Sequence, residues 1–172
     1  MPTAAIVGGG VIGSGWAARF LLNGWDVRFF DPSADAERVL QAVIDRGREA
    51  MPALSDRMPS EGTLHIAQST AEAVLGASYI QESTPERIEV KQAVLRSIQE
   101  ACDADAIVAS STSGFMPSEL QEGALRPEQI IVSHPYNPVY LLPLVEVVAS
   151  PKVPADLIRR ASNVLESVSM KP

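Results

Sequence analysis

The feature that most constrains the fold of this chain is a glycine-rich stretch close to the start of the sequence. Residues 4–7 are apolar and partly β-branched, which is typical of a short buried strand. Gly8, Gly10 and Gly13 then match the pattern G-x-G-x-x-G, and apolar residues follow at helical spacing. A strand, a glycine turn and a helix in this order are the context that a dinucleotide-binding fingerprint requires.

Each glycine of the motif has its own expected role. Gly8 permits a tight turn, Gly10 lets a pyrophosphate approach the backbone, and Gly13 lets the helix pack closely on the strand. Free N–H groups at the start of the helix, together with the helix dipole, favour phosphate there. We therefore expect the cofactor phosphates along the stretch formed by Gly8, Gly9, Gly10, Val11, Ile12 and Gly13.

An acidic residue stands where NAD-binding domains carry one. Residues 26–30 are typical of a second strand, and Asp31 ends it roughly 20 residues after the first glycine. A carboxylate there accepts hydrogen bonds from the ribose hydroxyls of NAD and repels the 2′-phosphate of NADP. Pro32 and Ser33 follow, so no adjacent arginine favours that phosphate. The alternative is that Asp31 only caps the turn before Pro32.

Composition limits the class of protein. A chain of 172 residues, 46% hydrophobic and 20% charged, suffices for one globular domain. The net charge of −7 argues against nucleic acid and against an anionic membrane as partners. The single cysteine excludes an internal disulfide and suits a reducing cytoplasm, and no Cys/His cluster offers a metal site. The start of the chain lacks a basic leader, so we expect neither a signal peptide nor a membrane span.

The rest of the chain alternates between predicted strands and helices. Further strands are expected over residues 64–68, 78–82, 107–110, 130–133 and 144–148, and further helices over 34–54, 70–75, 87–101, 117–122 and 154–168. Alternation of this kind indicates an α/β fold, a Rossmann-type, doubly wound and largely parallel sheet. Clusters at 8–13, 31, 82–86, 111–114 and 134–137 follow strand ends, so they should gather at the edge where such sheets bind ligands. The helix over 87–101 is expected to bury Val90, Ala93, Val94 and Ile98.

The candidate for acid–base chemistry is His134, because an imidazole titrates near neutral pH. Glu146 interrupts an apolar run, where an unpaired charge is costly, so it should orient the other ring nitrogen of His134. Ser113 offers a hydroxyl to a substrate oxygen, and Asn137 offers an amide to substrate, ribose or nicotinamide. The residues alone leave structural alternatives open: a structural His134 before Pro135, a turn role for Ser113, and a solvent-facing Glu146.

Taken together, these motifs resemble the L-3-hydroxyacyl-CoA dehydrogenase superfamily over nearly the whole chain. The run Ser111-Thr112-Ser113-Gly114 is similar to that family's S-N-T-S-S turn, with Ser111 in place of its asparagine. The run His134-Pro135-Tyr136-Asn137-Pro138 is similar to its H-F-F-N-P motif. The resemblance implies NAD-dependent oxidation of a 3-hydroxyl, with His134 as general base, Glu146 as its orienter and Ser113 as a contact to substrate and nicotinamide. Nucleotide contacts are implied for Glu86, Lys91 and Asn137.

The resemblance also bears on domain organisation. Residues 1–172 would form the NAD-binding domain, with its end one strand short of a full first domain. In the family a second, helical domain completes the active site and the homodimer. We therefore expect this chain to be a fragment whose turnover depends on that domain.

Within the superfamily, Gly-Trp-Ala at 15–17 and the stretch 134–146 are most similar to the enzymes that oxidise L-carnitine. Gulonate dehydrogenases and lens lambda-crystallins are relatives. The stretch 34–62 has no lysine and more acidic residues than arginines, which favours a small substrate over a polyanionic coenzyme A ester. Trp16, Tyr136 and Tyr140 should offer aromatic faces to a quaternary ammonium, unless they are packing residues. A hydroxyacyl-CoA or gulonate dehydrogenase, and a structural or non-catalytic NAD-binding protein, are the alternatives.

Overall fold

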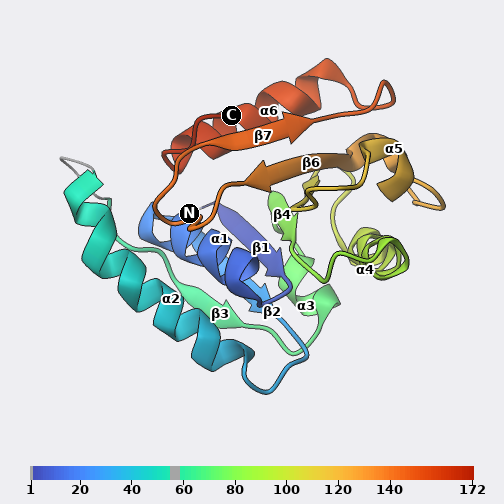
Figure 1. Cartoon of the computed structure of the whole chain (residues 1–172). Coiled ribbons are helices and arrows are strands. Elements are labelled where there is room, and N and C mark those ends of the chain that lie inside the picture. Colours follow the sequence, from blue (N-terminus) through green and yellow to red (C-terminus); the bar gives the residue numbers. More distant parts are fainter. Residues whose placement is uncertain (1, 55–58) are drawn as a thin grey trace.

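A seven-stranded sheet forms the centre of the computed structural model, which describes residues 2–54 and 59–172 (Figure 1). The strands are β1 (Thr3–Val7), β2 (Asp26–Phe30), β3 (Leu64–Ile66), β4 (Tyr79–Glu82), β5 (Ile107–Ser110), β6 (Ile130–Pro135) and β7 (Val145–Val148). Their order across the sheet is β3-β2-β1-β4-β5-β6-β7. The first six run parallel, and β7 pairs antiparallel with β6.

Helices cover both faces of this sheet. They are α1 (Val11–Leu22), α2 (Ala36–Ala50), α3 (Thr70–Val74), α4 (Ile88–Ala101), α5 (Pro117–Leu120) and α6 (Ala155–Ser167), with 3₁₀ turns η1 (Met51–Leu54) and η2 (Pro127–Gln129). Alternate residues of β1 enter opposite cores: Ala4 and Ile6 pack with α1, α2 and α6, while Ala5 and Val7 pack with α3, α4 and α5. The doubly wound α/β class is confirmed. Among the described residues, every helix is too short or too polar to cross a bilayer.

The strand order reverses between β1 and β4, which are neighbours in the sheet although β2 and β3 come between them in the chain. In an open parallel sheet the loops that leave such a pair diverge to opposite faces and leave a crevice between them. The glycine turn leaves β1 at this point, and residues 83–87 leave β4. The topology therefore places two of the predicted polar clusters on either side of one crevice.

Two expectations about individual elements were wrong. The strand predicted over 130–133 continues to Pro135, so His134 lies within β6 rather than after it, because pairing with β7 extends the ladder. In α4 the buried side chains are Lys91, Leu95, Ile98 and Gln99, while Ala93 is exposed. The connection between the helix predicted over 34–54 and the strand predicted over 64–68 includes residues 55–58, which lie outside the described residues.

Candidate active site

The glycine turn has no space for side chains at Gly8 and Gly13, where the backbone itself is in the way. Gly8 has a φ of +103°, and a Cβ there would lie 2.6 Å from the backbone of Ser83. A Cβ on Gly13 would lie 1.8 Å from the carbonyl oxygen of Gly8, so α1 packs directly on the turn. Among the described residues, a Cβ on Gly10 would meet nothing within 4 Å, and no side chain caps α1. The open space and the free helix start fit a pyrophosphate.

Asp31 lies beside this turn. Its Oδ2 accepts a hydrogen bond from the Gly9 N–H at 2.6 Å, and its Oδ1 accepts one from the Ser33 N–H at 2.7 Å. A carboxylate has about four lone-pair sites, so acceptor capacity remains for ribose hydroxyls. A cavity of about 510 Å³ opens here, lined by the glycine turn, Asp31, the start of α2 and residues 83–85. Its position suits the adenosine half of a dinucleotide.

His134 and Glu146 are directly opposite each other in the β6–β7 ladder. The His134 Nδ1 lies 2.9 Å from the Glu146 Oε2. Because the carboxylate can only accept, Nδ1 carries the shared proton, and the Nε2 of the neutral ring is left as an acceptor. The ring lines a second cavity of about 310 Å³ together with Ile12, Ser83 and Ser113. The pair therefore lies beside a space that also borders the start of α1.

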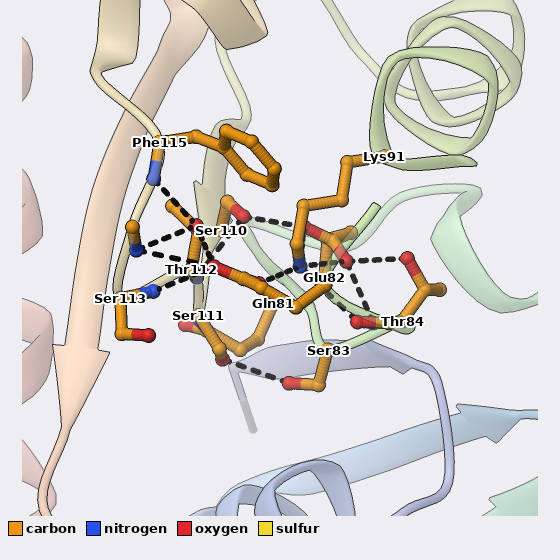
Figure 2. A network of polar contacts seen from close by, with 12 residues as sticks. Gln81, Glu82, Ser83, Thr84, Lys91, Ser110, Ser111, Thr112, Ser113 and Phe115 are labelled. Atoms are coloured by element: carbon orange, nitrogen blue, oxygen red, sulfur yellow. Dashed lines mark hydrogen bonds and ion pairs between the residues drawn. The ribbon is translucent and has the colours of Figure 1, made fainter. Parts of the chain in front are cut away.

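Glu86 and Lys91 belong to a polar network between β4, α4 and the turn after β5. Figure 2 shows Lys91 of this network together with Glu82 and Thr112. The Lys91 ammonium is 1% exposed and lies 3.0 Å from the Glu82 Oε1, 3.1 Å from the Thr84 carbonyl oxygen and 3.3 Å from the Glu86 Oε2. Glu82 is fully buried and also accepts hydrogen bonds from Thr84 and Ser110. The donors of Lys91 thus serve the protein itself, and its contact with the nucleotide stays a prediction.

The Glu86 carboxylate holds the turn that carries Ser113. Its Oε1 accepts hydrogen bonds from the backbone N–H groups of Ser113 and Gly114, both at 3.1 Å, and from the Thr112 hydroxyl. Burial acts most strongly on the pKa of Glu86 and raises it, but the hydrogen bonds and Lys91 together outweigh burial and lower the pKa. Glu86 therefore stays ionised and ties the turn to α4.

Two predicted site residues lie elsewhere. Asn137 does not line the cavity of His134, but a separate hollow of about 310 Å³ between α2 and the loop after β6, together with Tyr140. Trp16 is fully buried, packs against Phe20 and donates to Ser111, so the expectation that it offers an aromatic face to a ligand was wrong. Tyr136 is 40% exposed, and its ring centroid lies 5.8 Å from that of His134.

The cavities include residues that sequence reasoning did not single out. Ser83 and Thr84 line both the cavity of Asp31 and the cavity of His134, and Ser111 lines the cavity of His134. The available signal was the position of the clusters 82–86 and 111–114 after the ends of β4 and β5. It was not sufficient to select these residues, because hydroxyl groups are also common in ordinary turns.

A doubly wound sheet with a glycine turn, an acidic residue after β2 and a cavity at the strand-order reversal defines a dinucleotide-binding domain. The chain belongs to the family of the 3-hydroxyacyl-CoA dehydrogenase, NAD binding domain, whose model matches residues 3–172. NAD is accordingly the cofactor of this domain, and the residues of the turn fit it.

Two curated relatives carry related names. The chain is 59% identical over 173 residues to "L-carnitine dehydrogenase/betainyl-CoA thioesterase" of Ruegeria pomeroyi, covering 100% of this chain and 36% of that protein. It is 45% identical over 173 residues to "L-carnitine dehydrogenase" of Oceanobacillus iheyensis, covering 100% of this chain and 56% of that protein. The chain thus spans only about a third to a half of the length of these relatives.

Solved structures share the fold. An NAD⁺-dependent dismutase, 5-formyl-3-hydroxy-2-methylpyridine 4-carboxylic acid 5-dehydrogenase, superposes with a TM-score of 0.91 at 31% identity, covering 100% of this chain and 57% of that chain. The 3-hydroxybutyryl-CoA dehydrogenase of Escherichia coli superposes with a TM-score of 0.85 at 23% identity, covering 100% of this chain and 37% of that chain. The second likeness concerns the fold alone.

Proposed function

We propose that the whole protein oxidises the 3-hydroxyl of L-carnitine to 3-dehydrocarnitine, with NAD as cofactor. The observation that carries this proposal is the His134–Glu146 pair at 2.9 Å, whose ring borders the same cavity as the start of α1. The names of relatives that are 59% and 45% identical support the choice of substrate.

In this proposal the residues divide the chemistry among them. The His134 Nε2 takes the proton of the 3-hydroxyl, and Glu146 orients the ring and stabilises the imidazolium that results. The Ser113 hydroxyl donates a hydrogen bond to the reacting oxygen. Bound NAD would supply the acceptor for the hydride that leaves C3. Asp31 and the glycine turn hold the cofactor, to which Glu86, Lys91 and Asn137 contribute further contacts.

The surface along α2 favours a small substrate over a coenzyme A ester. Arg38 pairs with Asp35 at 3.4 Å, and Arg48 pairs with Asp45 at 2.8 Å and with Glu61 at 2.6 Å. These arginines are thus balanced by acidic partners, which weakens their attraction for a polyanion. Beside the base, the exposed ring of Tyr136 offers a face to a quaternary ammonium, a contact worth roughly 0.5–2 kcal/mol.

The resemblance also leads us to propose that the whole protein is a cytoplasmic homodimer. In this proposal, residues of the second, helical domain of the whole protein complete its active site. Light scattering of the whole protein measures its oligomeric state, and cell fractionation measures its compartment.

The decisive experiment is NAD reduction by the whole protein with L-carnitine, L-gulonate and 3-hydroxybutyryl-CoA, compared through kcat/KM. We expect L-carnitine to give the largest value. A kcat/KM roughly tenfold higher for the coenzyme A ester, about 1.4 kcal/mol in transition-state binding, would contradict L-carnitine as the substrate. The assignment of the protein as an NAD-dependent dehydrogenase would still hold. No reduction with any of the three would favour the non-catalytic alternative.

A further inference from the structure

A chain of buried hydrogen bonds leads from the middle of the sheet to the rim of both cavities. The Gln81 Nε2 donates to the Ser133 carbonyl oxygen at 3.3 Å and to the Ser111 Oγ at 2.8 Å. The Gln81 Oε1 accepts from the Tyr79 hydroxyl at 3.1 Å. Because a carbonyl oxygen can only accept, the contact with Ser133 determines which end of the Gln81 amide is the NH₂ group.

The hydroxyl of Ser111 has all its hydrogen-bonding capacity in use. It accepts from the Gln81 Nε2 and from the Trp16 Nε1 at 3.2 Å, and both of these groups can only donate here. A hydroxyl oxygen has two lone pairs, so both are occupied. The third neighbour of Ser111 is the Ser83 Oγ at 2.8 Å, to which Figure 2 draws a contact. Ser111 must therefore donate its single proton to Ser83.

This direction leaves the proton of Ser83 itself without a partner in the described part of the chain, where Ser111 is the hydrogen-bond partner of its hydroxyl. Ser83 lines the cavity of Asp31 and also the cavity of His134. Its Cβ lies only 3.2 Å from where a Cβ on Gly13 would be, so the hydroxyl is next to the glycine turn. A committed donor is thus positioned where the two cavities meet.

We propose that the Ser83 hydroxyl donates a hydrogen bond to an oxygen of the nicotinamide-ribose half of NAD, at the junction of the two cavities. The acceptor is a hydroxyl of that ribose or an oxygen of the pyrophosphate that precedes it. Gln81, Trp16 and Ser111 act through Ser83 as positioning residues, since they direct the Ser111 proton to Ser83 and leave the proton of Ser83 free to donate. The proposal rests on NAD as the cofactor of the proposed function, but not on L-carnitine or on His134 as base.

The test is the affinity of the whole protein for AMP, ADP, ADP-ribose and NAD without substrate, measured by isothermal titration calorimetry. Ser83→Ala should weaken ADP-ribose and NAD by roughly 3- to 30-fold, the range for one lost hydrogen bond, and leave AMP unchanged. An equal loss with ADP assigns the acceptor to the pyrophosphate, whereas unchanged ADP assigns it to the ribose. Unchanged affinity for all four ligands, or an equal loss for AMP, would overturn the proposal.

Two further variants separate the hydrogen bond from shape and from folding. Ser83→Cys fills similar space with only a weak donor, so it should lose affinity as Ser83→Ala does. Ser78→Ala is the matched control, because Ser78 precedes β4 at its other end and its exposed hydroxyl donates to Thr3. It should bind all four ligands like the wild type. Wild-type affinity for NAD in Ser83→Cys would contradict a hydrogen-bonding role.

Discussion

At the scale of single residues, the neighbours of His134 determine which of its ring nitrogens is engaged by the protein. Glu146 lies at Nδ1, and the ring borders the cavity that Ile12 and Ser113 also line. The Glu146 carboxylate is joined on its other oxygen by the Tyr136 hydroxyl at 3.4 Å. One nitrogen of the imidazole is therefore held by the protein, and our proposal assigns the reaction to the other.

We predict that His134→Gln lowers kcat of the whole protein by roughly 10²–10⁴-fold, the usual range for the loss of a general acid or base. NAD affinity should change little, because the glycine turn and Asp31 are distant in the chain and line a different cavity. Stopped-flow kinetics and calorimetry measure the two quantities. Glu146→Gln should slow turnover in the same way, and a near-wild-type kcat in His134→Gln would end the proposed mechanism.

Asp31 is predicted to set the choice between NAD and NADP. Asp31→Ala removes an acceptor for the ribose hydroxyls and the charge that repels a 2′-phosphate. The difference between the binding free energies of NAD and NADP should therefore decrease by about 1–3 kcal/mol. Titration of both cofactors into wild type and variant measures the ratio. Asp45→Ala, on the exposed side of α2 where Asp45 pairs with Arg48, is the control and should keep the wild-type ratio.

At the scale of elements, the start of α4 and the turn after β5 act as one unit. Glu86 and Lys91 connect them, with Glu82 buried beneath (Figure 2). The apolar spacing of α4 predicted Val90 and Ala93 on the buried face, because periodicity treats every lysine as a surface residue. The structure turns Lys91 inward, since the Glu82 carboxylate compensates the cost of burying its charge.

The lowered pKa of Glu86 predicts a pH-dependent contribution to stability. Its folded pKa lies below the ordinary value of 4.5, so its stabilisation is complete above that value and is lost as the pH falls through the folded pKa. In Glu86→Gln this part of the pH dependence should disappear. Urea unfolding of both proteins from about pH 7 down to about pH 3 measures the difference. Glu89→Gln, an exposed neighbour on α4, should retain the wild-type profile.

At the scale of the whole molecule, Arg19 joins the first helix to the last part of the chain. Its guanidinium is 3% exposed and donates to the carbonyl oxygens of Tyr140 at 3.1 Å and Ser169 at 2.7 Å. Burial lowers the pKa of Arg19 to about 10, so it is still charged at neutral pH. One charged side chain thus ties α1 to the loop after β6 and to the end of α6.

We predict that Arg19→Met lowers the free energy of unfolding by about 1–3 kcal/mol, because two carbonyl oxygens lose a charged donor. Chemical denaturation at neutral pH measures this loss. Arg38→Met is the matched control, since Arg38 is 74% exposed in its side chain and pairs with Asp35 at the surface. It should change the free energy of unfolding by less than about 0.5 kcal/mol. An equal effect in both variants would contradict a stabilising role of the Arg19 contacts.

Local pattern was enough for much of the architecture. The strands β2 and β5 have the predicted bounds, and the doubly wound class is confirmed. The turn at Gly8 and the close packing at Gly13 also follow from the sequence. These features depend on residues close together in the chain, where steric limits on the backbone and the alternation of apolar side chains act directly.

Tertiary structure decided the rest, because it brings together residues that are far apart in the chain. Antiparallel pairing of β6 with β7 puts Glu146 opposite His134, and packing buries Trp16 with its N–H on Ser111. The direction of the Ser111 proton follows only once every neighbour of Ser111 is known. Hydrogen-bond partners compete for a limited number of lone pairs and protons, so their assignment is a property of the assembled site and not of any one segment.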